Sequence, residues 1–329
     1  MIVDAHAHFV PLPLLETLRT EKRLFPSVKV EADGGATRLA FMDGPLTRPV
    51  SPKLSDVGAR QQWLGDAGID TQVVGGWLDM FGYELPPEEA ADWCRFLNEQ
   101  MKGGTAEHGF LAPLACVPLQ SGKLAAEILE EALGQGFHGT MIGTQPKGEG
   151  GNLDDPDLNP FWEVASAKAA TIFVHPMFVC GDERVNDYDM VNAVGRVADT
   201  TIAVARLLFS GHLTRYPGVK LIVSHGGAAL PFALGRLKRN HAIHPEHGDP
   251  LPEFQRLYFD TVMFEALALR YLCDVAGADK VMLGSDHPFP IGDPDPVKLI
   301  DETELTQAER KGILGNTAME LFHLDCDCH

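Results

Sequence analysis

The chain has 329 residues, of which 45% are hydrophobic and 8% aromatic, so it can bury a large core. Its formal net charge of −19 argues against binding to nucleic acid or to an anionic membrane surface, and local arginines must attract any anionic substrate. The six cysteines show no disulfide framework, and no early segment has the features of a signal peptide or membrane helix, which predicts a cytoplasmic protein.

The first predicted element is a buried strand from Val3 to Phe9, where apolar residues and small alanines precede the breaker Pro11. Because side chains alternate along a strand, His6 and His8 point to the same side. Two imidazoles at this spacing form a clamp for a metal such as zinc. The alternative is a pair of packed or solvent-facing histidines, so a metal site requires further ligands from other strand ends.

A small β insertion is predicted after a short helix over residues 11–24. Within residues 27–50, two segments alternate like strands, and Gly34–Gly35 supplies the turn between them. We expect this excursion in the first βα loop, which in a barrel enzyme hangs over the active-site end. Arg48 lies at its exit, where a solvated surface charge is the simplest interpretation.

The remainder of the chain alternates between short apolar strands and helices. Strands are expected over residues 70–75, 110–119, 137–144, 171–176, 221–227, 257–262 and 280–286, and helices over 54–67, 86–107, 124–133, 161–169, 193–209 and 306–322. Strands buried on both faces are typical of a parallel sheet, and eight such units predict a (β/α)8 TIM barrel. A doubly wound open sheet is the alternative, but no Gly-x-Gly-x-x-Gly follows an early strand. No linker divides the chain, so residues 1–329 are expected to form one domain.

Polar residues at the strand ends are expected to meet at one pole of this barrel. They are His6 and His8 on the first strand, His175 on the fifth, His225 on the sixth and Asp286 on the eighth. Each alone is more simply a satisfied core or rim residue, but burying all of them without partners is costly. Three histidines and a carboxylate with one open position suit a catalytic zinc ion. The tail at residues 325–329 has metal-ligand residue types too, but a frayed terminus is the simpler interpretation.

Several motifs together resemble the amidohydrolase superfamily, and more narrowly its 2-amino-3-carboxymuconate-6-semialdehyde decarboxylase-like branch. The resemblance covers most of the chain. The segments that carry it are Asp4–His8, Phe173–Pro176, Ser224–Gly227, Gly284–Pro290, Pro118, Ile142–Thr144 and Ala229–Arg236.

The resemblance implies a role for each matching residue. His6, His8, His175 and Asp286 ligate one zinc ion, or another divalent ion such as Mn2+. The members of the superfamily that bind two metals carry a lysine on the fourth strand; residues 141–144 offer none, which implies a mononuclear site.

The remaining roles concern the proton and the substrate. His225 is implied to be a general acid/base rather than a ligand, and Arg48 to hold a carboxylate of a small anionic organic acid. Arg236 matches an arginine that crosses a homodimer interface into the neighbouring site, although an ordinary helix salt-bridge residue is an equal alternative.

The chain also departs from the family pattern around the expected pocket. Met177–Phe178 replaces a tryptophan after the fifth-strand histidine, and His287 replaces a tyrosine after Asp286. The segment from residue 180 to 200 matches poorly. His287 and Phe289 are expected to contact substrate, but the identity of that substrate is not predicted.

Three functions are consistent with these residues. The first is a metal-dependent, non-oxidative decarboxylase of an unsaturated or aromatic acid. The second is a metal-dependent hydrolase or hydratase on the same scaffold, and the third is a metal-binding protein without turnover. Arg48 and the sequence contexts of His225 and Asp286 favour the first, and a complete ligand set with His225 disfavours the third.

Overall fold

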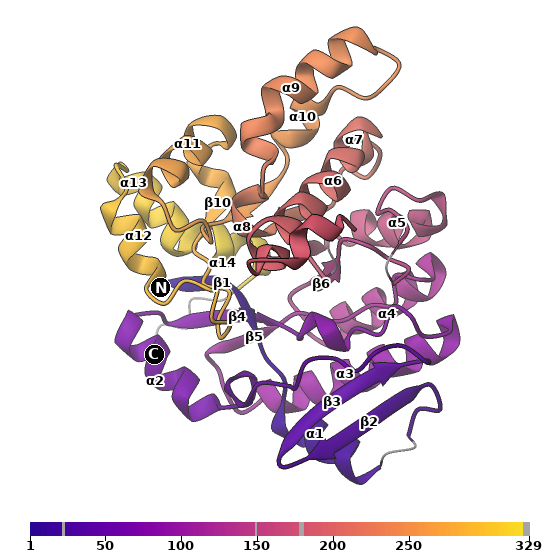
Figure 1. Ribbon diagram of the computed structural model, residues 1–329. Helices are drawn as coiled ribbons and strands as arrows, with labels where there is room; N and C mark the ends of the chain where they lie inside the picture. The colour runs from indigo at the N-terminus through magenta and orange to yellow at the C-terminus, as the bar shows by residue number, and fades with distance from the viewer. Residues whose placement is uncertain (22–23, 149, 178–180, 325–329) are drawn as a thin grey trace.

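The computed structural model of the chain describes residues 1–21, 24–148, 150–177 and 181–324. Within these ranges the fold is a barrel of eight short parallel strands surrounded by helices, as predicted (Figure 1). The barrel strands are β1 (Val3–His8), β4 (Thr71–Gly75), β5 (Leu111–Pro113), β6 (Thr140–Gly143), β7 (Thr171–His175), β8 (Lys220–Val223), β9 (Tyr258–Asp260) and β10 (Val281–Met282). Strands β1, β6 and β7 are buried along their whole length, as expected for a parallel sheet that is covered on both faces.

The ring closes because hydrogen bonds join a three-stranded sheet, β1–β4–β5, to a five-stranded sheet, β6 to β10. A parallel bridge between Ala115 and Thr140 connects β5 with β6. On the opposite side Ala7 bridges to His287, and the backbone N–H of His8 donates to the His287 carbonyl at 2.7 Å. Strand β1 therefore pairs with the segment that follows β10, and the carboxyl ends of all the strands face one pole.

Helices cover the outside of the barrel (Figure 1). The longer ones, of nine residues or more, are α1 (Leu12–Thr20), α2 (Val57–Ala67), α3 (Pro87–Thr105), α4 (Gly122–Gly134), α5 (Asn159–Ala167), α6 (Arg196–Phe209), α9 (Leu230–Ile243) and α11 (Ala266–Ala276). Shorter helices are α7 (His212–Arg215), α8 (Ser224–Gly227), α10 (Pro250–Phe254), α12 (Pro296–Glu302), α13 (Gln307–Lys311) and α14 (Thr317–Phe322). The 3-10 turns are η1 (Pro52–Leu54), η2 (Leu78–Met80), η3 (Pro156–Leu158), η4 (Glu183–Asn186) and η6 (Ala278–Lys280), and the π turns are η5 (Val191–Gly195) and η7 (Gly312–Asn316).

The predicted insertion is an antiparallel hairpin of β2 (Val28–Asp33) and β3 (Ala36–Phe41). Its two-residue turn places Gly34 and Gly35 at φ +54° and +87°, a conformation that glycine adopts without steric cost. The hairpin lies beside α1 and α3, where Phe41 contacts Trp93 of α3 with ring centroids 5.8 Å apart (Figure 1). The segment that leaves the hairpin brings Arg48 to the carboxyl-terminal pole of the barrel.

Several element boundaries differ from the predicted ones. Strands β5 and β10 end at Pro113 and Met282, earlier than the predicted residues 119 and 286. Strand β8 ends at Val223, and Ser224–Gly227 form a tight turn instead of continuing the strand. The last predicted helix is a run of α13, the π turn η7 and α14.

Cys94, Cys116 and Cys273 are buried free thiols, whereas Phe178, Cys180 and the tail from residue 325 to 329 lie outside the described residues. Within the described ranges, no helix has both the length and the hydropathy needed to cross a membrane.

Candidate metal centre and cavity

Strand β1 carries His6 and His8 into the barrel, and both side chains are fully buried. Asp4 holds this strand against the segment after β10, because its carboxylate accepts hydrogen bonds from the backbone nitrogens of His6 at 3.1 Å and Ser285 at 3.0 Å. Burial raises the pKa of Asp4, although these hydrogen bonds oppose the shift. Since Ser285 precedes Asp286, Asp4 also positions the predicted carboxylate ligand.

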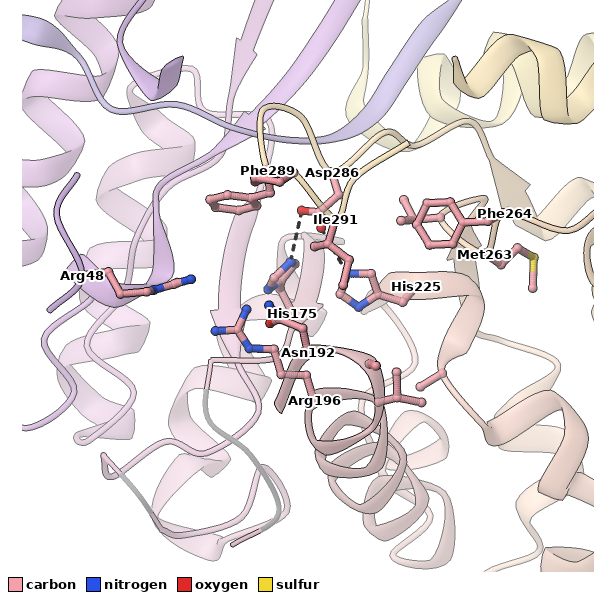
Figure 2. Close-up of a pocket in the computed structure, with 15 residues that line it drawn as sticks. Arg48, His175, Asn192, Arg196, His225, Met263, Phe264, Asp286, Phe289 and Ile291 are labelled. Carbon is pink, nitrogen blue, oxygen red and sulfur yellow. Dashed lines mark ion pairs between the residues drawn. The ribbon is translucent and has the colours of Figure 1, made fainter. Parts of the chain in front are cut away.

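The four predicted histidines converge on the carboxylate of Asp286. Its Oδ1 atom lies 3.3 Å from Nε2 of His6 and 3.0 Å from Nε2 of His8. The same oxygen lies 3.7 Å from Nε2 of His175, whereas Oδ2 lies 3.6 Å from Nε2 of His225. Figure 2 shows His175 and His225 pointing toward Asp286. The three predicted histidine ligands thus face one carboxylate oxygen, and the predicted acid/base faces the other.

An oxygen acceptor lies at the Nδ1 atom of each predicted histidine ligand. Asp260 Oδ2 lies 2.6 Å from Nδ1 of His6, the Gly76 carbonyl 3.0 Å from that of His8, and the next residue's carbonyl 3.0 Å from that of His175. A proton on Nδ1 leaves the Nε2 lone pair available to a metal. The Nε2 atoms of His6 and His175 are buried without a hydrogen-bond partner in the described part of the chain. This donor set fits a divalent cation.

The electrostatics of the site favour the deprotonated form of three of the four predicted ligands. Burial lowers the pKa of His8 and holds that of His175 well below its usual range. Burial would raise the pKa of Asp286, but the neighbouring histidines, His6 first, hold it well below the ordinary value. His6 differs, because Asp286 and Asp260 overcome its burial and raise its pKa to about 10. A metal bound at Nε2 must therefore displace a proton from His6, while the other ligands are already in the binding form.

His225 occupies the tight turn after β8 rather than the end of the strand. Its backbone is left-handed, with φ +56° and ψ +48°, which is uncommon for a residue other than glycine. Asp260 stabilises this turn by accepting hydrogen bonds from the backbone nitrogens of His225 at 2.9 Å and Gly226 at 2.8 Å. The turn aims the imidazole at the cavity, where 19% of the side chain is exposed.

The predicted ligand set and the most compact set of ligand atoms in the structure differ at one position. The residues whose ligand atoms all lie within 4.8 Å of one another are His6, His175, His225 and Asp286, a set that omits His8. Yet Nε2 of His8 is the nitrogen nearest to Asp286 Oδ1, and its Nδ1 is held in the same way as that of the other predicted ligands. His225 instead faces Oδ2 and is more exposed, which favours His8 as the ligand.

A cavity of about 490 Å³ opens from this cluster toward the solvent (Figure 2). His175, His225 and Asp286 form its floor, and apolar side chains after β9 and β10 form one wall. The complete lining is Arg48, His175, Asn192, Ala193, Arg196, Val197, His225, Ala228, Val262, Met263, Phe264, Asp286, Phe289, Pro290 and Ile291.

Two of the four predicted substrate residues line the cavity. Phe289 packs against the His8 ring with a centroid distance of 4.7 Å. Arg48 lies at the mouth with 55% of its side chain exposed, and its guanidinium binds Asp79 through contacts of 3.1 to 3.4 Å. Arg48 is therefore available to a ligand, but a carboxylate already neutralises much of its charge.

The other two predicted substrate residues lie away from this cavity. The His287 ring stacks on Trp63 of α2 with centroids 4.3 Å apart, and burial together with nearby Arg60 lowers its pKa to about 3. Arg236 is exposed on α9 and does not line the cavity. The structure thus gives His287 a packing contact and leaves Arg236 outside its own subunit's site.

Three residues that the sequence reasoning missed belong to this site. Asp260 connects His6 with the His225 turn, and Asn192 and Arg196 line the cavity from η5 and α6. Asp260 lies near the end of the seventh predicted strand, residues 257–262, so its position toward the active pole was a usable signal. Asn192 and Arg196 are four residues apart, a spacing that places two helical side chains on one face. Both lie within residues 180–200, the segment that matched the family poorly.

Comparison with known proteins agrees with this fold and with the resemblance seen in the motifs. The sequence profile of the amidohydrolase family matches residues 3–324. The chain is 28% identical to 2-amino-3-carboxymuconate-6-semialdehyde decarboxylase from Dictyostelium discoideum, over 98% of this chain and 92% of that protein.

Two solved structures have the same fold. One is 5-carboxyvanillate decarboxylase from Sphingomonas paucimobilis, with a TM-score of 0.81, 23% identity and coverage of 98% of this chain and 99% of that chain. The other is dihydroxybenzoic acid decarboxylase from Polaromonas sp. with bound manganese and the inhibitor 2-nitroresorcinol, with a TM-score of 0.78, 21% identity and coverage of 98% and 97%.

Proposed function

Because this chain belongs to the amidohydrolase family, we propose that it is a metal-dependent decarboxylase that removes CO2 from an unsaturated or aromatic carboxylic acid without an oxidant. The observation that carries the proposal is the arrangement around Asp286, where three histidines face one oxygen and His225 faces the other beside an open cavity. The decarboxylase names of its relatives support this activity over hydrolysis or hydration on the same scaffold.

His6, His8, His175 and Asp286 are proposed to hold one divalent ion per chain. When bound, such an ion would polarise a substrate oxygen and stabilise the negative charge that develops there. We propose zinc, because three imidazole nitrogens and one carboxylate oxygen are ligands that zinc prefers. Manganese is the alternative, and the similar Polaromonas structure contains it.

Metal analysis of purified protein tests this ligand set. The wild type is expected to contain about one divalent ion per chain. His175→Ala and Asp286→Ala should each lose both metal and activity, while His108→Ala, which changes a histidine before β5, should lose neither. Full metal occupancy in either ligand variant would remove that residue from the site.

His225 is proposed to transfer the proton. Its protonated imidazole donates to the substrate carbon that bears the carboxylate; the bond between that carbon and the carboxylate then breaks, and its electron pair remains on the substrate as CO2 leaves. The left-handed turn places the ring at the cavity floor, within 3.6 Å of Asp286.

The cavity suits a small, flat, anionic acid. Its volume of about 490 Å³ is that of a site for a small molecule. Met263, Phe264 and Phe289 offer apolar contacts, and Arg48 is proposed to hold a substrate carboxylate. These features predict a substrate with an apolar body and a charged end.

A homodimer in the cytoplasm is the proposed form of the protein. On α9 and α11, Phe232 and Leu267 are 87% and 85% exposed, and the Phe232 ring lies 6.4 Å from that of Tyr271. Large apolar side chains exposed together are typical of an interface. Arg236 lies one helical turn after Phe232, so the proposed interface would carry it to the neighbouring subunit.

The activity test is a panel of acids incubated with metal-loaded protein, with CO2 release as the measurement. The panel contains carboxylated aromatics and muconates, with amides, lactones and esters of the same skeletons assayed for hydrolysis. We expect CO2 from at least one acid and no hydrolysis. Hydrolysis without CO2 release would contradict the proposed function.

A further inference from the structure

The first turns of the helical segment at η5 and α6 carry two polar side chains into the cavity. Asn192 lies in the π turn η5, and Arg196 is the first residue of α6. Figure 2 shows both of them on the side of the cavity opposite Phe264 and Met263. Because π turns inside helices are frequently found at functional sites, the two side chains at this turn are candidates for a functional role.

Each of these two side chains has one buried polar atom that lacks a hydrogen-bond partner in the described part of the chain. The Nε atom of Arg196 and the Oδ1 atom of Asn192 are buried without a hydrogen-bond partner in the described ranges. Leaving such a group buried and unpaired destabilises the protein, and the penalty is larger for a charged group. Arg48 differs, because Asp79 binds its guanidinium. The cavity therefore holds one arginine that is already paired and one that lacks a protein carboxylate in the described structure.

The charge of Arg196 is also unfavourably placed in the absence of an anion. Burial first, and then the positive charge of Arg48, lower its pKa. Two guanidiniums beside one cavity, in a protein of net charge −19, form a local positive site that an anionic ligand would stabilise.

Helix α6, which carries Arg196, is held in place by another of its residues. Asp199 accepts hydrogen bonds from the Thr144 hydroxyl and, at 2.8 Å, from Nε2 of Gln145, both of which follow β6. The arginine thus extends from a helix that is tied to the barrel, and little ordering is needed when a ligand binds.

We infer that Arg196, assisted by Asn192, binds a second carboxylate that the substrate retains, so that the substrates of this protein are dicarboxylic acids. This inference rests on the proposed function, in which the carboxylate that leaves lies beside His225 and Asp286. The planar guanidinium matches a carboxylate with two hydrogen bonds, and the Asn192 amide offers a third contact. Arg196 is a specificity-determining residue here, and Arg48 at the mouth makes a smaller contribution because Asp79 competes for it.

The test measures binding with matched pairs of acids that differ only by one carboxylate. The pairs are isophthalate with 3-methylbenzoate, and cis,cis-muconate with the matching monoacid in which one carboxylate is a methyl group. Calorimetry on metal-loaded wild type should show that at least one diacid binds about tenfold or more tightly than its monoacid partner. Arg196→Gln should reduce that preference to about twofold while leaving the affinity for the monoacid unchanged.

Three further variants make the result specific. Arg206→Gln changes an arginine on the same helix whose partner is Asp154 outside the cavity, and it should keep the full preference. Arg48→Gln should weaken the preference less than Arg196→Gln. Arg196→Lys keeps the charge but not the planar fork, and it should retain part of the preference, which separates recognition from misfolding.

The inference is overturned if the wild type shows no preference, or if Arg196→Gln keeps it or weakens both members of a pair equally. These outcomes do not depend on turnover. A diacid preference without CO2 release from any acid would contradict only the proposed decarboxylation, whereas CO2 release from monoacids at the same kcat/KM as from diacids would contradict only this inference.

Discussion

At the scale of single residues, the site depends on two carboxylates with different tasks. Asp286 faces all four imidazoles, and Asp260 holds the far side of His6 and the backbone of the His225 turn. Asp286 is itself left-handed, with φ +59°, as is His225. Non-glycine residues are rarely held in this conformation unless the surrounding structure requires it, and such residues cluster at functional sites.

Replacing His225 by asparagine separates its two possible roles. If His225 is the general acid/base, His225→Asn keeps its metal and loses turnover roughly a hundredfold or more, because the proton donor is missing. Asparagine is chosen because it accepts a left-handed backbone. Metal content and kcat are measured on the same sample, and a loss of metal in step with activity would make His225 a ligand.

His212 on α7 gives the stability of the protein a dependence on pH that has no connection with catalysis. Its ring is buried against Trp162 and Tyr216, neither nitrogen has a hydrogen-bond partner in the described structure, and burial lowers its pKa to about 4. The unfolded chain takes up the proton near pH 6.5, so acid favours unfolding. This contribution is absent above about pH 6.5 and grows until the pH reaches about 4.

The test compares the wild type with His212→Phe, which keeps an aromatic ring between the same neighbours. Between pH 7 and pH 5, protonation of His212 should lower the free energy of unfolding of the wild type by about 2 kcal/mol relative to the variant. Denaturant titrations of both proteins at each pH give this difference, and the exposed-histidine variant His244→Phe is the control. Equal losses in wild type and His212→Phe would show that His212 titrates normally in the folded protein.

At the scale of elements, the active pole is built from the short segments that follow the strands. Asp260 at the end of β9 accepts hydrogen bonds from the turn after β8 and from His6 on β1, so it connects three strands of the barrel. A neutral replacement of the same size should weaken all of these contacts at once. Asp260 is therefore expected to support both the proposed metal ligand His6 and the proposed proton donor His225.

Asp260→Asn is expected to lower metal affinity about tenfold to a hundredfold, the usual effect of removing a carboxylate that orients a ligating histidine. Turnover at saturating metal should fall too, because the His225 turn loses its acceptor. Asp279→Asn, on the exposed turn η6, is the matched control. The role of Asp260 is refuted if metal affinity and saturated kcat both match those of the control.

The eight strands and the hairpin could be predicted because their apolar runs and glycine turns are local signals. The gathering of the four histidines around Asp286 could be predicted too, since parallel strand ends meet at one pole, whereas their separate roles came from the resemblance and stay predictions. The predicted end of β8 was wrong because the apolar run was extended through Gly226–Gly227, a pair that favours a turn. The Asp260 carboxylate that holds this turn comes from another strand and could not be predicted locally. Arg196 was missed because a helical arginine is usually exposed, and only the tertiary structure turns it into the cavity.

At the scale of the whole molecule, substrate recognition opposes the net charge. The formal charge of −19 repels an organic anion, while Arg48 and Arg196 attract it at one pole. Arg236 does not line the cavity of its own subunit, because it is exposed on α9. Its predicted role therefore depends on a second copy of the chain.

Mixing two inactive variants tests that role. Arg236→Ala and His225→Asn are each expected to be nearly inactive, but a mixed dimer contains one site that has both groups if Arg236 reaches the neighbour. We expect activity to return when the two proteins are unfolded and refolded together, and to fall on dilution of the wild type. Verified mixed dimers without recovered activity would exclude Arg236 from the neighbouring site.

The pairing of β1 with the segment after β10 has a consequence for synthesis on the ribosome. His8 and Asp286 are 278 positions apart in the chain, yet their side chains lie 3.0 Å from each other. At about 5–20 residues per second, His6 and His8 wait on the order of tens of seconds before the carboxylate is made. Until Asp286 is made, the nascent chain lacks one of the four proposed ligands, so tight capture of an ion would coincide with closure of the barrel. The ion would then bind last and stabilise the closed barrel. Metal supply would therefore govern how much newly made protein reaches the closed form.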